Sequence, residues 1–247
     1  MSITDRALTT LIMSIPIGKL HNMFKNREIT SEKVDPPFIV RLDGVKFGKR
    51  LQRFQRPRDR TVHEALLMSA ERIMRYMGAE LGYVTSDEIN ILFLRYSPYS
   101  SRYFKIISIS SGIASSATTN MLKTELFYDS RIIKVYNIDE IFKYILYRVR
   151  TGFNNFVSSL CHIYGKIPRE YTPHIQDMIC IAMKIRKDIE NWELFGTLLY
   201  REKYFKTCED RISGGRVQVR RSRIVRREVS IDVVHELRNI METLFKS

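Results

Sequence analysis

Short runs of apolar and β-branched residues alternate with polar segments along the first half of the chain, which is typical of buried strands joined by turns and helices. The runs that predict strands cover residues 38–42, 81–84, 89–94 and 131–136. The first run ends at Asp43-Gly44, a pair that favours a turn. The second and third runs are so close that they predict a hairpin with Asp87 and Glu88 at its bend.

Apolar residues recur at helical spacing in the segments between these strands. Residues 62–77 predict one amphipathic helix, and residues 101–121 predict a second whose small residues favour close packing against a neighbour. The order strand, helix, strand, strand, helix, strand is that of a split βαβ, ferredoxin-like arrangement. The predicted fold class is therefore α+β: a palm-like antiparallel sheet with helices on one face, followed by a C-terminal helical segment and a basic β-ribbon.

The rest of the chain adds elements on either side of this predicted palm. Asp139 and Glu140 complement the dipole of a long helix that we expect from Ile138 to about His162. Further elements, in the order helix, strand, β-ribbon and short helix, are expected at residues 173–192, 196–200, 214–231 and 235–245. An amphipathic helical segment is expected over residues 3–27. We assign a palm-like catalytic core to residues 1–150 and a helical segment with an Arg-rich ribbon to residues 151–247, packed as one compact unit.

The two acidic corners are the candidate chemistry of the predicted sheet. Asp43 and Asp87 follow strands of one sheet, so they could meet at one of its edges. A few carboxylate oxygens are the ligands of a hard divalent cation that keeps positions for water and phosphate. A pair of such cations can hold the attacking and leaving oxygens of an in-line displacement, as in the palms of polymerases and cyclases. Because Asp-Gly and Ser-Asp are also common turn sequences, a purely structural role is the alternative.

The chain is strongly basic. Its 247 residues include 41 Lys and Arg against 27 Asp and Glu, a formal net charge of +14. This charge attracts polyanions, with nucleic acid the first candidate and an anionic membrane surface the second. Within the predicted ribbon we expect six arginines to contact RNA phosphates: Arg216, Arg220, Arg221, Arg223, Arg226 and Arg227. A charged edge strand that discourages aggregation is the alternative.

Other signals exclude several classes of protein. No apolar run approaches the roughly 20 residues of a membrane span, and the N-terminal sequence has no convincing signal peptide. We therefore expect a cytoplasmic protein that does not enter a membrane. The three cysteines are widely separated and lack a C-x-x-C spacing, so neither a disulfide framework nor a zinc site is indicated.

Several short motifs, taken in order, resemble those of the histidine-tRNA guanylyltransferase superfamily. They are R-L-D-G-V-K-F (41–47), F-Q-R-P-R-D (54–59), S-D-E (86–88), Y-D-S-R-I-I (128–133) and N-N (154–155). The tail, G-T-L-L-Y-R-E-K-Y-F-K (196–206) and then G-G-R-V-Q-V-R-R-S-R (214–223), is more similar to the shorter archaeal and bacterial members, the guanylyltransferase-like 3′-to-5′ polymerases. The resemblance covers about residues 36–225.

This resemblance implies an enzyme that adds nucleotides to tRNA 5′ ends with the help of two Mg²⁺ ions. A 5′-monophosphate is first activated, commonly by ATP, and the 3′-hydroxyl of GTP or another incoming nucleoside triphosphate then attacks it. By position, Asp43, the Gly44 carbonyl and Asp87 would hold the metal ions, and Asp43, Asp87 and Glu88 would be the catalytic carboxylates. The candidate positions for nucleotide and triphosphate binding are Lys46, Phe47, Arg56, Asp59, Ser86, Arg102, Lys105 and Asn155.

The chain also departs from the family pattern. Gly48 and Gly152 stand where many eukaryotic members have histidines, and Arg201-Glu202-Lys203 takes the place of a K-N-E element. These departures favour template-dependent repair of tRNA 5′ ends. A dedicated histidine-tRNA guanylyltransferase that adds a single G is the alternative, and a non-catalytic RNA-binding protein is the alternative from another class. The resemblance further implies a homotetramer, a dimer of dimers that shares one tRNA.

Overall fold

The computed structural model describes residues 19, 22–23, 32–165, 167–168, 170–171, 173–209 and 214–246. The chain separates into two compact units, Met1–Glu32 and Lys33–Ser247. The helical segment predicted over residues 3–27 lies outside the described residues apart from three positions. The strands are β1 (Phe38–Gly44), β2 (Leu81–Thr85), β3 (Glu88–Phe93), β4 (Tyr128–Lys134), β5 (Thr197–Glu209) and β6 (Arg216–Glu228). The helices described below are α3 (Phe47–Arg50), α4 (Arg60–Met77), α5 (Tyr103–Leu122), α6 (Ile138–Ile163), α7 (Ile175–Ile185), α8 (Asn191–Phe195) and α9 (Ile231–Lys246).

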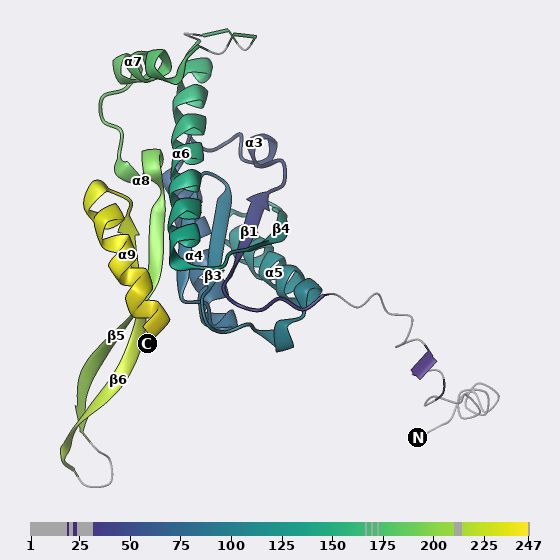
Figure 1. Cartoon of the computed structure of the whole chain (residues 1–247). Coiled ribbons are helices and arrows are strands. Elements are labelled where there is room, and N and C mark those ends of the chain that lie inside the picture. The colour runs from purple at the N-terminus through teal and green to yellow at the C-terminus, as the bar shows by residue number, and fades with distance from the viewer. Residues whose placement is uncertain are drawn as a thin grey trace. The chain divides into compact units, whose positions relative to one another are not determined.

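All six strands form one antiparallel sheet, in the order β4-β1-β3-β2-β5-β6 (Figure 1). The first four have the order of the split βαβ arrangement, so the predicted palm is confirmed. The register places Asp43 of β1 directly opposite both Glu88 of β3 and Asp129 of β4. Residues opposite one another on neighbouring strands share a face, so these three carboxylates form one row across the sheet.

Helices α4 and α5 cover one face of the sheet. Alternate residues of β1, among them Val40 and Leu42, are buried there in a cluster with Ile73 and Met74 of α4, as the period of two in a strand requires. Helix α4 ends at Gly78, whose φ of 81° lies in the left-handed region that glycine adopts readily.

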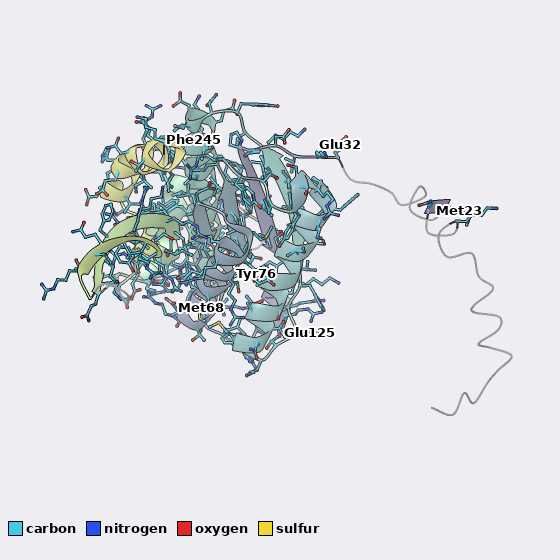
Figure 2. All side chains as sticks on the ribbon, turned by 90° about the horizontal axis from the view of Figure 1, so that it is seen from below. Met23, Glu32, Met68, Tyr76, Glu125 and Phe245 are labelled. Carbon is cyan, nitrogen blue, oxygen red and sulfur yellow. The ribbon has the colours of Figure 1, made fainter. Side chains whose placement is uncertain are left out.

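Helices α6 and α9 cover the opposite face. Ile39 of β1 and Tyr83 of β2 pack there in a cluster that also contains Ile145 of α6. Figure 2 separates the two helical layers, with α9 and its Phe245 on one side of the sheet and α4 and its Tyr76 on the other. The palm helices thus lie on one face as predicted, and the C-terminal segment supplies a second layer.

The long helix predicted from Ile138 is confirmed as α6, and the predicted domain boundary at residue 150 falls inside it; the two-part division stays a prediction. The single helical region predicted over residues 173–192 is instead two helices, α7 and α8. The break occurs at Arg186, whose backbone is extended (φ −144°, ψ 128°). Its guanidinium binds both oxygens of Glu193, at 2.7 and 2.8 Å. Among the described helices, none is long and apolar enough to cross a membrane.

Strands β5 and β6 form a projecting arm (Figure 1). They pair along 13 positions, whereas β5 pairs with β2 only from Thr197 to Tyr200. The strand predicted at residues 196–200 is therefore only the base of a much longer one. Val229 N donates to Gly196 O at 3.0 Å, so the chain returns to the point where the arm begins. Residues 210–213, between β5 and β6, lie outside the described residues.

Candidate active site

Asp43 and Asp87 lie together at one end of the sheet. Asp43 is the penultimate residue of β1, and Asp87 is the second residue of the two-residue turn that joins β2 to β3. Gly44 N donates to Asp87 O at 3.1 Å, which joins the end of β1 to that turn. Ser86, the first residue of the turn, has a φ of 56°, a left-handed conformation that is uncommon outside glycine and concentrates at functional sites.

The carboxyl group of Asp87 is largely buried and lies near two other carboxylates. Burial raises the pKa of its carboxyl group, and the nearby negative charges of Asp43 and Glu88 raise it further. In the described part of the chain, Asp87 has no ion pair within 4 Å. The neighbouring Gly44 cannot be enlarged, because a Cβ atom there would lie 2.5 Å from the Phe47 ring. Asp87 is thus a largely buried carboxylate without an ion pair to any described residue, and it lies beside a second carboxylate, Asp43. Two such carboxylates are ligands that suit a hard cation.

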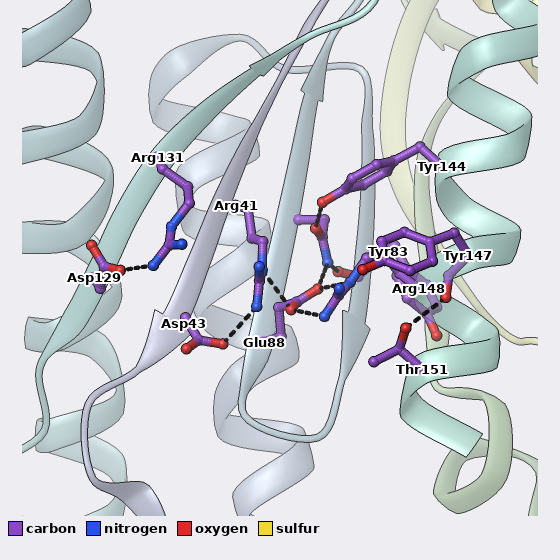
Figure 3. Close-up of polar contacts among 11 residues, drawn as sticks. Arg41, Asp43, Tyr83, Glu88, Asp129, Arg131, Tyr144, Tyr147, Arg148 and Thr151 are labelled. Carbon is purple, nitrogen blue, oxygen red and sulfur yellow. Dashed lines mark hydrogen bonds and ion pairs between the residues drawn. The ribbon is translucent and has the colours of Figure 1, made fainter. Parts of the chain in front are cut away.

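Glu88 has a different position from the one predicted. It is the first residue of β3 and not part of the bend, and its side chain is buried. Its Oε1 accepts from Arg148 Nε at 2.8 Å and from Asn90 Nδ2 at 2.7 Å, and its Oε2 accepts from Arg41 Nε at 2.7 Å (Figure 3). Arg148 Nη2 also donates to Oε2. Both oxygens are therefore occupied, and Glu88 connects the sheet to α6.

The row of carboxylates is balanced by a row of arginines. Like charges directly opposite one another destabilise a sheet. Two residues along β1 and β4, on the same face, Arg41 donates to Asp43 at 3.1 Å and Arg131 binds Asp129 (Figure 3). Arg41 and Arg148 were not predicted as members of this site. The one available signal was the helical spacing of Tyr144 and Arg148, which places them on one face of α6.

A cavity of about 210 Å³ opens beside Asp87. Besides Ser86, its lining includes three predicted nucleotide-binding residues, Phe47, Arg56 and Asp59, which the structure thus brings together with Asp87. Most of the remaining wall is apolar and is formed by Leu51, Phe54, Pro57, Val62 and Trp192, and the rest of it includes Gln55, Arg58 and His63. Gly48 also lines it, and a Cβ at Gly48 would meet no atom within 4 Å. An apolar slot with polar groups at one end is typical of a small-molecule site.

Two buried residues that line this cavity, Arg58 and His63, were not predicted as site residues. His63 Nε2 lies 2.8 Å from Thr197 Oγ1, and burial, with Arg58 and Arg60 nearby, lowers the pKa of His63 to about 3. Burial also lowers the pKa of Arg58 to about 10. The Arg58 guanidinium donates to the carbonyl of Glu193 and, at 2.8 Å, to that of Gly152. Arg58 therefore connects the segment between α3 and α4, which lines the cavity, to α8 and α6.

Asp59 lines the cavity and also caps α4, because it accepts from Thr61 N and Val62 N at 2.7 and 3.2 Å. The predicted nucleotide-binding residues outside the cavity are dispersed. Lys46 and Asn155 are exposed, before α3 and on α6 respectively. Arg102 forms a β-bridge with Lys33, which precedes β1, whereas Asp43 is at the far end of that strand.

Lys105 lies near the start of α5. Its side chain is over the Tyr99 ring and lines a second, shallow groove of about 490 Å³, whose lining also includes Asp129, the residue opposite Asp43. The seven residues of β1, which separate the Arg102 bridge from Asp43, span about 20 Å. The structure therefore does not bring Arg102 to Asp43 and Asp87 within one chain, whereas Lys105 shares a groove with Asp129 but does not line the cavity beside Asp87.

The six arginines of β6 fall into two groups. Arg226 binds Glu64 and Glu71 of α4 at 2.8 and 2.6 Å, and Arg227 binds Glu236 of α9. Arg223 pairs with Glu202 across the arm. The three nearest the tip are exposed and have no ion pair with any other described residue: Arg216, Arg220 and Arg221. The arginines at the base of β6 therefore have a structural role in ion pairs, whereas those near the tip remain available for the predicted contact with RNA.

The donor set at Asp43 and Asp87 is small. In the described part of the chain, no group of three or more His, Cys, Asp or Glu side chains has the arrangement of a complete metal site. Two carboxylates and the Gly44 carbonyl leave most positions of a six-coordinate cation for water or phosphate, which is how Mg²⁺ is usually bound in nucleotide-dependent enzymes. The residues present therefore fit a cation that a phosphate ligand completes.

Fold and site together define a palm-like α+β domain with paired carboxylates at the end of the sheet beside a mainly apolar cavity. A family model described as "Thg1: tRNAHis guanylyltransferase" matches residues 21–142. The matched segment is just under half of the chain, and this similarity to the tRNAHis guanylyltransferase (Thg1) family confirms the resemblance predicted from the motifs.

Solved structures share the fold over most of the chain. A bacterial tRNA(His) guanylyltransferase (Thg1)-like protein in complex with ATP has a TM-score of 0.70 and 23% identity, covering 93% of this chain and 99% of its own. Its complex with GTP has a TM-score of 0.70 and 21% identity, covering 94% and 100%. The tRNA(His) guanylyltransferase of Saccharomyces cerevisiae has a TM-score of 0.60 and 14% identity, covering 86% and 98%. At these identities the likeness concerns the fold.

A curated relative comes from a virus. The protein named "Uncharacterized protein R259" of Acanthamoeba polyphaga mimivirus is 25% identical over an alignment of 232 residues, which covers 77% of this chain and 79% of that protein.

Proposed function

We propose that the protein is a Mg²⁺-dependent nucleotidyltransferase that adds nucleotides to tRNA 5′ ends in the 3′-to-5′ direction, with the opposite strand as template. The observation that carries the proposal is that Asp43 and Asp87 lie together at the end of the sheet, where Asp87 lines the 210 Å³ cavity. The family match and the ATP and GTP complexes of the bacterial relative support a nucleoside triphosphate as substrate.

In this proposal the cavity receives the base of the nucleotide, between Phe47, Phe54 and Trp192. Its apolar walls exclude water from the base, and Arg56 and Ser86 lie at the polar rim, where they would orient the phosphates. Two divalent cations held by Asp43, Asp87 and the Gly44 carbonyl would neutralise the phosphate charge during transfer. No side-chain nucleophile is required, because phosphoryl transfer depends mainly on positioning and charge neutralisation.

Two glycines support templated repair over the addition of a single G. They occupy positions at which many eukaryotic relatives have histidines. A Cβ at Gly152 would lie 2.4 Å from Thr85 Oγ1, so α6 can approach β2 only with glycine there. Gly48 leaves its side of the cavity open. The site therefore lacks both imidazoles, and we propose that pairing with the opposite RNA strand, in their place, selects the incoming nucleotide.

The arm and the assembly complete the proposal. We assign the contact with the tRNA backbone to Arg216, Arg220 and Arg221, because they are the exposed arginines of β6 without an ion pair to another described residue.

We also propose a homotetramer, as the family resemblance implies. Light scattering after size-exclusion chromatography would measure its mass against the 29.2 kDa of one chain.

The test is incubation of a 5′-monophosphorylated tRNA that lacks its first nucleotide, and of full-length histidine tRNA, with Mg²⁺, ATP and all four nucleoside triphosphates. We expect restoration of the missing complementary base by the wild-type protein and by Asp129→Asn, and its loss in Asp87→Asn. Asp129 is the control because it lies at the same end of the sheet, opposite Asp43, but does not line the cavity. Addition of one G to histidine tRNA alone would instead identify a dedicated guanylyltransferase. Binding of both RNAs without extension would identify an RNA-binding protein.

A further inference from the structure

We propose that Arg41 competes with a divalent cation for the carboxylate of Asp43 and thereby sets the cation affinity of the candidate active site. This inference rests on the proposed function, because it concerns the same carboxylates. Arg41 is a positioning residue here, since it acts on the cation site through Asp43.

Arg41 holds two carboxylates with different strength. Its Nε donates to Glu88 at 2.7 Å and its Nη2 donates to Asp43 at 3.1 Å. The Glu88 side chain is 4% exposed, whereas that of Asp43 is 41% exposed. A charge-assisted hydrogen bond in a buried position is worth more than one that water can replace. Asp43 is therefore the partner that Arg41 gives up more easily.

The network behind Arg41 keeps its guanidinium in place when that contact is released. Glu88 is bound by Arg148 through both oxygens and by Asn90 through Oε1. Asn90 in turn accepts from Tyr144 of α6 at 2.6 Å. Figure 3 shows these side chains as one continuous set of polar contacts from α6 to β1. Arg41 is thus a positive charge fixed next to Asp43 and not a mobile surface side chain.

Such an arrangement opposes cation binding in two ways. The guanidinium occupies Oδ1 of Asp43, and its charge repels an approaching cation. Replacing Arg41 by a neutral residue frees the acceptor and removes the repulsion, so cation affinity should rise. The same change leaves Asp43 and Glu88 without a shared counter-charge, so the protein without added cation should become less stable.

The chain offers a matched control on the neighbouring strand. Arg131 of β4 lies directly opposite Arg41 and binds Asp129, two residues away, as Arg41 binds Asp43. Asp129 lies outside the proposed ligand set. Arg131→Gln therefore removes the same charge from the same row without releasing Asp43.

The experiment is a titration of the full-length chain with Mn²⁺ alone, in which electron paramagnetic resonance measures the free ion. We expect Arg41→Gln to bind Mn²⁺ about tenfold more tightly than the wild type, equivalent to about 1.4 kcal/mol, and Arg131→Gln to differ by less than about threefold, because exposed charges are screened. In chelator, the melting temperature of Arg41→Gln should fall below that of the wild type, and Mn²⁺ should raise it by a larger increment.

Unchanged or weaker binding in Arg41→Gln would overturn the inference, and so would equal tightening in both variants, which would show an effect of regional charge alone. Asp43→Asn separates this failure from failure of the proposed function: if the wild type binds no Mn²⁺, or if Asp43→Asn binds it as well as the wild type, the cation site itself is wrong. Should circular dichroism show that Arg41→Gln is unfolded, Arg41→Lys replaces it. Lysine is a point charge without the forked geometry that bridges two carboxylates. The Mn²⁺ affinity of Arg41→Lys should therefore be higher than that of the wild type, by less than the tenfold expected for Arg41→Gln.

Discussion

The imidazole ring of His63 is stacked on the indole of Trp192, with ring centroids 4.7 Å apart and planes 29° from parallel. One ring comes from the first turn of α4 and the other from α8, so this contact joins the palm to the C-terminal segment across the back of the cavity.

This burial predicts an acid-dependent loss of stability. The pKa of His63 is lowered to about 3, whereas an unfolded histidine titrates near about 6.5. Between these values the unfolded chain binds a proton that the folded chain does not, so the free energy of unfolding contributed by His63 is intact above pH of about 6.5 and falls below it, approaching about 1.4 kcal/mol per pH unit. Urea denaturation between pH 7 and 5 should show a smaller decline in His63→Phe than in the wild type. Exposed His235, replaced by Gln, is the control; an equal change there would contradict the assignment to His63.

Gly152 predicts a steric effect that a second mutation should relieve. Gly152→Ala would place a methyl group 2.4 Å from Thr85 Oγ1 and should lower the free energy of unfolding by about 1–3 kcal/mol through overpacking. Adding Thr85→Ala should recover part of that loss, a coupling that a double-mutant cycle by chemical denaturation measures. Gly112→Ala in α5 is the matched control, because nothing lies within 4 Å of its Cβ, and it should stabilise the helix by about 0.5–1 kcal/mol. Strict additivity of the two changes at 85 and 152 would argue against the contact.

Asp59 has both a structural and a proposed nucleotide-binding role, and two substitutions separate them. Asp59→Ala removes the cap of α4 and should cost about 1 kcal/mol of stability. Asp59→Asn keeps an oxygen for Thr61 N and Val62 N, so its melting temperature should stay near that of the wild type. If Asp59 contacts the nucleotide, Asp59→Asn should still raise the KM for the nucleoside triphosphate. A wild-type KM in Asp59→Asn would limit this residue to capping.

The two groups of arginines in β6 should differ in RNA affinity. Replacing both Arg220 and Arg221 by Gln should weaken tRNA binding at all sequences and reduce the slope of log affinity against log salt by about 2, one unit per phosphate contact. Arg227→Gln should leave that slope unchanged and instead lower the melting temperature, because Arg227 pairs with Glu236 of α9. Filter binding at several salt concentrations measures the slope. Equal slopes in all variants would exclude the tip of the arm from the RNA interface.

The palm could be predicted from sequence because the hydrophobic periodicity of short segments is enough to predict its strands and helices. Periods of two and of 3.6 are properties of consecutive residues, so α4, α5 and α6 were found close to their observed bounds. Glu88 shows the limit: its sequence position beside Asp87 suggested the bend, but the two-residue turn places it in β3, where Arg41 and Arg148 bind it. Those partners come from β1 and α6, and no local pattern reports which distant residues a sheet and a helix will bring together.

The same limit applies to charge. All six arginines of β6 were predicted from the sequence to contact RNA. In the structure, glutamates of α4 and α9 form ion pairs with the arginines at the base of the strand and not with those near its tip. Arg102 was assigned by family position alone, and its bridge to Lys33, before β1, places its backbone at the far end of that strand from Asp43 within the same chain.

The closure between Val229 and Gly196 makes the arm a module of adjustable length. Because the chain leaves and re-enters the sheet at one hydrogen bond, residue pairs can be deleted from or added to the distal ribbon without moving α9 or the cavity. Each such pair shifts the tip by about 3.3 Å, comparable to one base-pair step along a nucleic acid helix. Proteins with this fold could therefore differ in how far along an RNA the arm reaches while the active site stays the same. A series of variants with shortened arms would measure that reach.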